Sequence, residues 1–162
     1  MEQLNDSDLR LLYSVSGNEI NIDRYNYLRQ LLTGSSSNCY IVKNINGDIC
    51  GYCAMWFGEG LYDQIFGRIK NLNINDNGYL FRDYTFKKFR GKGVQKFMIY
   101  SRLEILRNNG YKTATTRIAI GNYISERVYK KFGFIGNLIE IRFPLLNAFY
   151  TMSNLVLLIP ID

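Results

Sequence analysis

The sequence predicts a single α+β domain over residues 1–162, with a central, mixed but mostly antiparallel, twisted sheet that helices flank. Strand-like apolar runs are interleaved with amphipathic segments of helical period. Between two of these strands lies a segment long enough for a helical crossover, which makes that pair parallel. Finally, 162 residues with 47% apolar and 21% charged side chains suffice for one compact core.

The first half of the chain is expected to form two helices followed by two antiparallel strands. Asn5-Asp6-Ser7 can cap a short helix, and Gly34 with its serine run can end a second. Asn46-Gly47 suits a tight hairpin between the strands. The predicted helices are Asp8–Tyr13 and Asn21–Leu32, and the predicted strands are Cys39–Lys43 and Ile49–Phe57. We expect a loop over residues 58–78, with Tyr62–Ile69 as an alternative strand within it.

The second half alternates strands and helices. The predicted strands are Tyr79–Phe86, Thr113–Ile120, Phe134–Phe143 and Ser153–Ile159, and the predicted helices are Gly93–Asn108 and Asn122–Phe132. Val94, Phe97, Met98 and Ile105 are expected to share the apolar face of the first helix. The right-handed crossover makes the strands at Tyr79 and Thr113 parallel neighbours. Ligands often bind at the carboxyl ends of such strands, beside a helix N-terminus.

The positive charge of the chain is concentrated in one short segment. The net charge is +6, and between Arg82 and Lys96 a single acid, Asp83, accompanies six basic residues: Arg82, Lys87, Lys88, Arg90, Lys92 and Lys96. This concentration favours a local anionic partner over a general surface property.

The cysteines and the chain ends indicate a cytoplasmic protein without a metal site. There are three cysteines and no histidine, and the first residues lack the pattern of a signal peptide. Cys50 and Cys53 lie in a predicted strand, where positions three apart face opposite sides, so we interpret them as structural. Leu155 to Ile161 is too short to span a membrane.

The strongest local signal is Arg90-Gly91-Lys92-Gly93-Val94, which follows a predicted strand and opens a predicted helix. Glycines let a backbone approach an anion closely, and the free amides of a helix start point at phosphate oxygens. Alone, this pattern is equally typical of an ordinary tight turn. About thirty residues later, Asn122, Ser125, Tyr129 and Gly133-Phe134 follow in order.

Together these segments resemble the GNAT superfamily of acetyl-CoA-dependent N-acetyltransferases over roughly residues 79–134. In that family a strand, an Arg/Gln-x-x-Gly-x-Gly/Ala loop and a helix precede an Asn-x-x-Ser…Tyr…Gly-Phe segment. Gln95 departs from the small residue at the end of the loop. The resemblance implies a GNAT-like fold whose two parallel strands splay at the CoA site, with acetyl-CoA as acyl donor and no metal.

The resemblance also implies roles for individual residues. Backbone amides from Lys92 to Lys96 would hold the CoA pyrophosphate, and basic neighbours would steer or contact its phosphates. The pantetheine arm would bond strand backbone near Tyr84 and Thr85 and would contact Asn122, and Tyr129 would lie beside the sulfur. The residues expected at the cofactor are Tyr84, Thr85, Arg90, Gly91, Lys92, Gly93, Val94, Gln95, Lys96, Asn122 and Ser125.

Each of these side chains also has a purely structural interpretation. Asn122 can cap a helix, Ser125 can support that cap, and Tyr129 can be a core aromatic residue with a bonded hydroxyl. Only the occurrence of all these residues in this order along the chain favours a functional interpretation over a structural one.

For catalysis, the amine must lose its proton, and Tyr129 can protonate the departing thiolate. Asp83 is the candidate base, because positions 79, 81, 83 and 85 of a strand would share one face. A salt bridge to a nearby basic group is the structural alternative for Asp83. Glu59 and Tyr79 are the other candidate bases. Phe81 and Trp56 can shape an acceptor pocket or belong to the core.

The expected function is therefore acetyl transfer to a primary amine by direct transfer in a ternary complex. The preferred acceptor is a small molecule, such as an amino sugar, with no nucleic acid or membrane as partner. A CoA-binding regulatory domain without turnover and a basic nucleic-acid-binding domain are the alternatives. The oligomeric state, including a homodimer, stays open.

Overall fold

A seven-stranded mixed sheet forms the centre of the computed structural model, which describes residues 1–33, 37–57, 76–140 and 154–161. The strands lie in the order β1-β2-β3-β4-β5-β7-β6. Within the described ranges only β4 and β5 pair in parallel, which confirms the predicted mixed, mostly antiparallel sheet. The strands are β1 Glu2–Gln3, β2 Ser37–Lys43, β3 Ile49–Trp56, β4 Asn77–Thr85, β5 Thr113–Ala119, β6 Ile135–Glu140 and β7 Asn154–Pro160.

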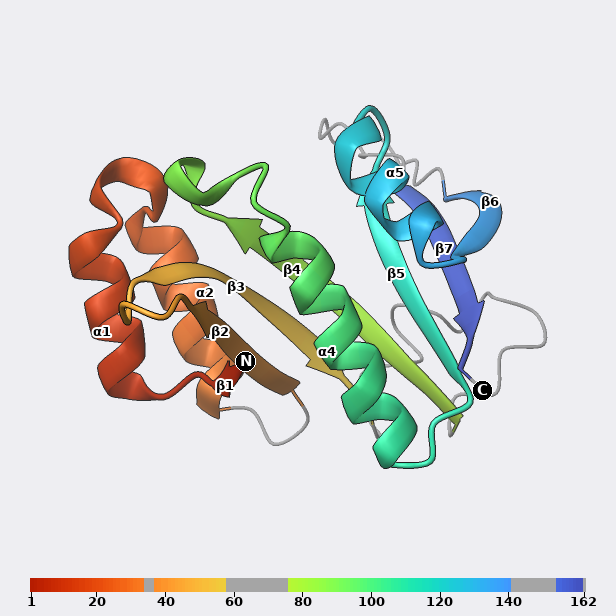
Figure 1. The fold of residues 1–162 in the computed structure, drawn as a ribbon, viewed down its shortest axis with the longest axis horizontal. Coiled ribbons are helices and arrows are strands. Elements are labelled where there is room, and N and C mark those ends of the chain that lie inside the picture. The colour runs from red at the N-terminus through yellow and green to blue at the C-terminus, as the bar shows by residue number, and fades with distance from the viewer. Residues whose placement is uncertain (34–36, 58–75, 141–153, 162) are drawn as a thin grey trace, which may run out of the picture.

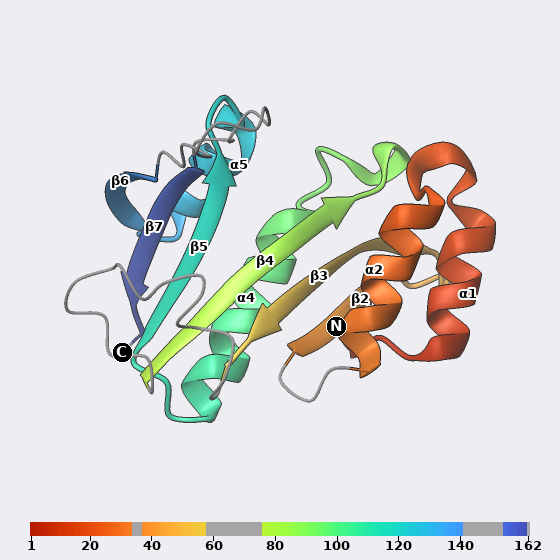
Figure 2. The ribbon, with the colours of Figure 1, turned by 180° about the vertical axis from the view of Figure 1, so that it is seen from behind.

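Helices cover both faces of this sheet. On one face lie α1 (Asp6–Val15) and α2 (Ile22–Thr33), and on the other lie α4 (Val94–Asn108) and α5 (Tyr123–Lys131) (Figures 1 and 2). Two short 3-10 turns, η1 (Gly17–Glu19) and η3 (Lys87–Phe89), precede α2 and α4. The molecule therefore has a helix layer on each side of the sheet.

The N-terminal helix begins earlier than predicted. The Asn5 side chain accepts a hydrogen bond from the Asp8 amide at 2.8 Å, so Asn5 is the cap and the helix starts at Asp6 instead of Asp8. The two-residue strand β1 was not predicted from the sequence. It is held by pairing of Glu2 with Ile41, a long-range contact that leaves no local pattern.

The apolar face of α4 differs from the predicted one. Met98, Ile99 and Leu106 are fully buried, whereas Phe97 is 46% exposed, so its assignment to the apolar face was wrong. Four-residue spacing from Met98 through Arg102 to Leu106 defines the buried stripe, and Phe97 lies beside it.

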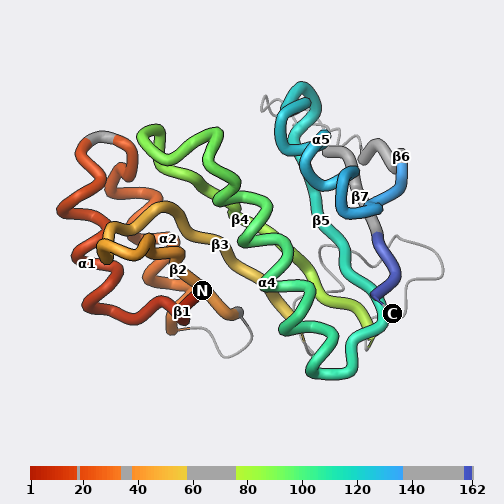
Figure 3. The backbone as a smooth tube through the Cα atoms, in the orientation of Figure 1, coloured from red at the N-terminus to blue at the C-terminus, as the bar shows by residue number. Residues whose placement is uncertain are grey.

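The parallel pair is joined over only part of its length. Pairing runs from Asn77↔Thr113 to Leu80↔Thr116, although β4 continues to Thr85 and β5 to Ala119. Beyond the last pair the two strands diverge (Figure 3). The predicted splay is therefore present.

A β-bulge bends β4 near the start of the splay. Its pairing with β3 shifts register between Tyr52 and Ala54, and Arg82 has a φ of 57°. Bulges bend a strand and increase its twist, which accounts for the departure of β4 from β5.

Several predicted segments extend beyond the described residues. The strands predicted at Phe134–Phe143 and Ser153–Ile159 are present as β6 and β7, but residues 141–143 and 153 are outside the description. The predicted loop over 58–78 overlaps β4, which begins at Asn77. Its remainder through residue 75, including Glu59 and the alternative strand Tyr62–Ile69, also lies outside.

The three cysteines are free and buried. Burial raises the pKa of Cys39 and of Cys53 to about 12, so these thiols are uncharged core groups and not nucleophiles. Across the described ranges, no helix has the length and apolar character needed to cross a membrane.

Candidate functional site

The loop before α4 presents backbone amides beside the splayed strands. Gly91 and Gly93 have φ values of 76° and 82°, and an added Cβ at either position would meet nothing within 4 Å. The first backbone bond at this end of α4 runs from the Phe97 amide to the Gly93 carbonyl, at 3.0 Å. The amides of Val94, Gln95 and Lys96 precede that bond and have no intrahelical acceptor, so the loop has the predicted form of an anion cradle.

Basic side chains surround this cradle. Lys87, Lys88, Arg90, Lys92 and Lys96 are all exposed. The ammonium groups of Lys88 and Lys92 lie 4.7 and 5.6 Å from the centroid of the Phe89 ring, which is buried beneath them. Arg82 differs from this group, because its guanidinium stacks over Tyr27 of α2 at 4.3 Å.

Glu19, a residue that was not predicted from the sequence to belong to the site, anchors the segment before the loop. The Glu19 carboxylate accepts hydrogen bonds from the Lys87 amide at 3.0 Å and from the Tyr84 hydroxyl at 2.8 Å. Burial alone would raise the pKa of the Glu19 carboxyl, but these donors outweigh burial and the pKa lies below its usual value. Glu19 thus stays charged and ties η1 to β4 and η3.

Arg90 also stabilises the loop. Its Nε donates to the Thr85 carbonyl at 3.2 Å, and its guanidinium lies 5.9 Å from the Tyr84 ring centroid. Tyr84 and Thr85 therefore lie at the end of β4, adjacent to the loop, as the sequence predicted. Their edge facing β5 lies past the last parallel pair, Leu80↔Thr116.

The start of α5 is linked to the start of α4. Asn122 Oδ1 accepts from the Ser125 amide at 3.3 Å, which is the capping arrangement weighed as a structural alternative. Gln95 Nε2 donates to Ser125 Oγ at 3.2 Å. The residue that departs from the expected loop pattern, Gln95, therefore bridges the two helices next to the cradle.

Tyr129 and Asp83 meet in a buried network with Arg102. The Tyr129 hydroxyl donates to Asp83 Oδ2 at 2.7 Å, and Arg102 Nη2 lies 2.6 Å from Asp83 Oδ1. The second contact is an ion pair without hydrogen-bond geometry. Arg102 Nη2 also donates to the Tyr129 hydroxyl at 3.3 Å. Both carboxylate oxygens of Asp83 are therefore engaged.

Arg102 is completely buried within α4. Its Nε donates to the Met98 carbonyl at 3.0 Å, and its Nη1 donates to the Ala54 carbonyl at 2.8 Å. Burial alone would lower the pKa of Arg102, but the Asp83 carboxylate outweighs it and the pKa is raised. Burial, together with the Asp83 charge, also raises the pKa of the Tyr129 phenol. The site thus holds a fixed cation, a carboxylate and a neutral hydroxyl.

The partner of Asp83 was not foreseen. The structural alternative predicted from the sequence was a salt bridge to one of the six basic residues between Arg82 and Lys96. The ion pair is instead made with Arg102 of α4. A signal was available, since Arg102 falls at four-residue spacing between Met98 and Leu106, on the apolar stripe of α4.

The predicted common face for positions 79, 81, 83 and 85 was wrong. The rings of Tyr79 and Phe81 stack at 5.1 Å on the side of Arg82 and Tyr27, whereas Asp83 points to Arg102 and Tyr129 on the α4 side. The bulge at β4, with Arg82 at φ 57°, adds a residue and reverses the alternation. Asp83 therefore lies away from Tyr79, Phe81 and Trp56, which pairs with Tyr79.

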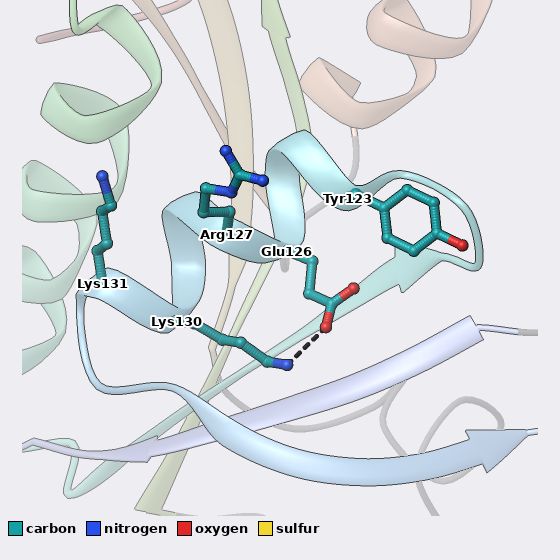
Figure 4. A pocket seen from close by; sticks show the side chains of 5 residues that line it. All are labelled: Tyr123, Glu126, Arg127, Lys130 and Lys131. Atoms are coloured by element: carbon teal, nitrogen blue, oxygen red, sulfur yellow. Dashed lines mark hydrogen bonds and ion pairs between the residues drawn. The ribbon is translucent and has the colours of Figure 1, made fainter.

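An open pocket of about 430 Å³ lies on α5, apart from these residues. Figure 4 shows the five side chains that line it and the ion pair of Glu126 with Lys130, 2.6 Å long. None of the residues predicted from the sequence lines this pocket. The lining residues are Tyr123, Glu126, Arg127, Lys130 and Lys131.

Comparison with known proteins identifies the family to which this arrangement belongs. The model of the acetyltransferase (GNAT) family matches residues 4–134. No curated protein sequence is similar enough to this chain to count as a match.

Solved structures share the fold at low identity. A spermidine N-acetyltransferase from Vibrio cholerae, in complex with CoA and spermine, has a TM-score of 0.69 and 14% identity, with 99% of this chain and 94% of that chain covered. The ribosomal-protein-S18-alanine N-acetyltransferase from Escherichia coli has a TM-score of 0.70 and 13% identity, with 99% and 92% covered.

Proposed function

Because the chain belongs to the GNAT family of acetyltransferases, we propose that it transfers an acetyl group from acetyl-CoA to a primary amine of a small molecule. Direct transfer within a ternary complex needs no covalent enzyme intermediate. Holding the amine against the acyl group would itself supply much of the rate acceleration. Acetyl-CoA, when bound, supplies an acetyl group activated as a thioester.

The observation that carries this proposal is the end of parallel pairing at Leu80↔Thr116, beside the glycine loop of α4. A strand edge that has lost its neighbour offers backbone groups to an extended ligand. The amides of Val94, Gln95 and Lys96, with the exposed Lys92 and Arg90 nearby, suit a pyrophosphate. These residues fit the phosphate and pantetheine parts of CoA.

In this proposal the amides from Lys92 to Lys96 bind the pyrophosphate, and Gly91 and Gly93 give the loop its backbone shape. Tyr84 and Thr85 bond the pantetheine arm through their backbone. Asn122 and Ser125 lie on the opposite side of the splay, at the start of α5.

Tyr129 and Asp83 are proposed to move protons. Asp83 takes the proton that the amine loses and returns it to the Tyr129 oxygen, while Tyr129 gives its own proton to the leaving sulfur. The hydrogen bond of 2.7 Å between them supports this exchange, since the proton needs to move only along an existing bond. Arg102 contacts both groups and positions them.

We also propose that the protein works in the cytoplasm. Three free, buried thiols support a reducing compartment.

Thermal unfolding with and without acetyl-CoA tests the proposal. Ligand at 100 times its dissociation constant should add about 2.7 kcal/mol to the free energy of unfolding. Purified protein should first be shown to be folded and free of carried-over CoA. Protein that is stabilised should then release thiol from acetyl-CoA when a suitable amine is added.

The outcomes separate the alternatives. Absence of stabilisation at millimolar acetyl-CoA would overturn the acetyltransferase proposal. Stabilisation without thiol release across a broad set of amines would instead indicate a CoA-binding domain without turnover.

A further inference from the structure

The turn between α1 and α2 contacts the segment that leads into the glycine loop of α4 (Figure 1). Glu19 of η1 makes this contact. Its Oε2 accepts from the Tyr84 hydroxyl at 2.8 Å and from the Lys87 amide at 3.0 Å, and its Oε1 lies 3.3 Å from the same amide. One carboxylate therefore holds both ends of the segment 84–87.

Glu19 also replaces a missing cap. The 3-10 turn η3 has Phe86 as its N-cap residue, whose side chain makes no capping hydrogen bond. The first amide of η3, that of Lys87, is bound instead by the Glu19 carboxylate. Amides at the start of a helical turn have no partner within the turn, so an acceptor from another element stabilises it. The position of η3 thus depends on a residue of the α1 and α2 side.

The carboxylate and its donors belong to a fixed cluster. Arg24 of α2 donates from Nη1 to the Glu19 carbonyl at 3.2 Å, and its guanidinium lies 4.6 Å from the centroid of the Tyr84 ring. The Tyr84 ring stacks on Tyr52, which is buried in β3, at 5.5 Å. Glu19 is therefore held through its backbone while its side chain holds the end of β4.

The segment that Glu19 holds continues directly into the proposed phosphate cradle. The Arg90 amide donates to the Lys87 carbonyl at 3.2 Å, and Arg90 Nε donates to the Thr85 carbonyl at 3.2 Å. Gly91 and Gly93 follow with positive φ. Displacement of Lys87 would therefore displace Arg90 and the start of the glycine loop.

We propose that Glu19 is a positioning residue for acetyl-CoA, which fixes the segment 84–90 so that the loop amides are ready to bind the pyrophosphate. The inference rests on the proposed function and adds a residue between α1 and α2 to the cofactor site. Glu19 acts through Tyr84 and Lys87 and does not itself touch the cofactor. A loop that adopts its binding conformation for only a fraction of the time binds its ligand more weakly by that fraction.

Charge and position predict opposite results when Glu19 is replaced. Acetyl-CoA is an anion, so loss of a nearby carboxylate would, through charge alone, strengthen its binding. Loss of the hydrogen bonds to Tyr84 and Lys87 would instead release the loop and weaken binding. Salt screens the charge effect over distance, whereas the hydrogen bonds of 2.8 and 3.0 Å are direct. We therefore expect the effect on position to be the larger one.

Titration calorimetry with acetyl-CoA tests this inference without an acceptor. Glu19→Ala removes both carboxylate oxygens and should raise Kd for acetyl-CoA roughly tenfold, the effect expected of a hydrogen bond to a charged group. Glu19→Gln keeps one side-chain oxygen as an acceptor and should raise Kd by a smaller factor. Titrations should be made at about 0.15 M salt and well below the unfolding midpoint of each variant.

Glu104→Gln is the matched control. Glu104 is a partly exposed residue in the second half of α4 that pairs with Arg107, so its replacement removes the same charge away from the loop. This variant should bind acetyl-CoA as tightly as wild-type protein does.

Amide hydrogen exchange, measured by mass spectrometry without ligand, separates positioning from a general loss of stability. In Glu19→Ala, exchange should become faster over residues 84–93 and stay unchanged over residues 98–108 of α4. An equal increase in exchange across both segments would overturn the inference.

Unchanged or tighter binding of acetyl-CoA by Glu19→Ala would also overturn the inference. If Glu19→Ala does not fold, Glu19→Gln decides, since an unchanged Kd in that variant contradicts the inference and a raised Kd supports it. Wild-type protein separates this failure from that of the proposed function. Wild-type protein that binds acetyl-CoA no better than the variants do refutes only the inference, whereas wild-type protein that does not bind acetyl-CoA refutes both.

Discussion

Arg102 shows how a single charged residue can organise the proposed site. A guanidinium with no exposed surface is tolerated because three backbone carbonyls, the Tyr129 oxygen and the Asp83 carboxylate surround it. Such a buried pair adds little net stability, but removal of one partner leaves an uncompensated charge. Arg102 therefore fixes where Asp83 and Tyr129 can lie.

Replacement of Tyr129 by Phe should reduce acetyl transfer. We expect kcat to fall by roughly 100-fold, the lower range for loss of a general acid, while stabilisation by acetyl-CoA is kept. The free energy of unfolding should also fall by about 1–3 kcal/mol, because Asp83 loses a buried hydrogen-bond donor. Rates should thus be measured well below the unfolding midpoint.

Tyr100→Phe is the control for this change, since Tyr100 lies exposed on α4. An unchanged kcat in Tyr129→Phe would exclude Tyr129 as proton donor and leave it as a core residue of α5.

At this scale the sequence predicted the participants better than their contacts. Tyr129 and Asp83 were singled out, and the structure brings them together. Their common partner, Arg102, was missed because the predicted apolar face of this helix included Phe97 and not the four-residue stripe on which Arg102 lies. Glu19 was missed for another reason, since its contacts with Tyr84 and Lys87 join segments more than sixty residues apart.

Among the elements, α4 has a glycine with positive φ at each of its two ends. Gly93 at its start and Gly110 after its end have nearly equal φ values of 82° and 80°, and a Cβ at either would meet nothing within 4 Å. The two glycines therefore adopt the same backbone conformation but lie at opposite ends of the helix. Only Gly93 lies in the proposed phosphate cradle.

Gly93→Ala and Gly110→Ala should thus be a matched pair. Each should lower the free energy of unfolding by about 1–2 kcal/mol, the cost of a left-handed conformation for a residue with a Cβ. Only Gly93→Ala should weaken stabilisation by acetyl-CoA, because only this methyl group is added within the proposed phosphate cradle. Thermal unfolding with increasing acetyl-CoA measures both effects, and equal loss of acetyl-CoA stabilisation in the two variants would contradict the cradle.

Local patterns predicted the elements well, and their failures have a common cause. The helix and strand positions follow from hydrophobic periodicity, helix-capping residues and glycines at the ends of elements, all of which are properties of neighbouring residues. The bulge at Arg82 depends on the register between β3 and β4, which leaves no mark in either strand alone. Since one extra residue reverses every later side chain, the predicted face of Asp83 was lost with it.

Across the whole molecule, the core of the described residues is rich in groups that ionise only at high pH. Burial raises the pKa of Cys39 and Cys53 to about 12 from an ordinary 9.0, and that of Tyr52 and Tyr79 to about 12 from 10.0. The absence of histidine in the sequence removes the side chain that usually titrates near neutrality. Alkaline conditions should therefore affect stability more than mild acid or neutral pH does.

The direction of this dependence follows from linkage. Each of these groups holds its proton more tightly in the folded protein than in the unfolded chain. Its contribution to the free energy of unfolding is therefore complete below its unfolded pKa, and it is lost as pH rises through the folded pKa. The free energy of unfolding should be level from about pH 7 to about pH 9 and fall from there to about pH 12. Each group that is ionised only in the unfolded chain contributes a slope of about 1.4 kcal/mol per pH unit.

Urea unfolding between pH 7 and 11 measures this slope, with Cys39→Ala as the comparison. Removal of this thiol should make the decline shallower by about 1.4 kcal/mol per pH unit once pH exceeds its unfolded pKa, and should leave the level region unchanged in shape. The variant will be less stable at every pH because a buried side chain is shortened, so the slopes and not the absolute values carry the comparison. Equal slopes for the two proteins would show that the Cys39 thiol ionises as readily in the folded protein as in the unfolded chain, and would contradict its burial.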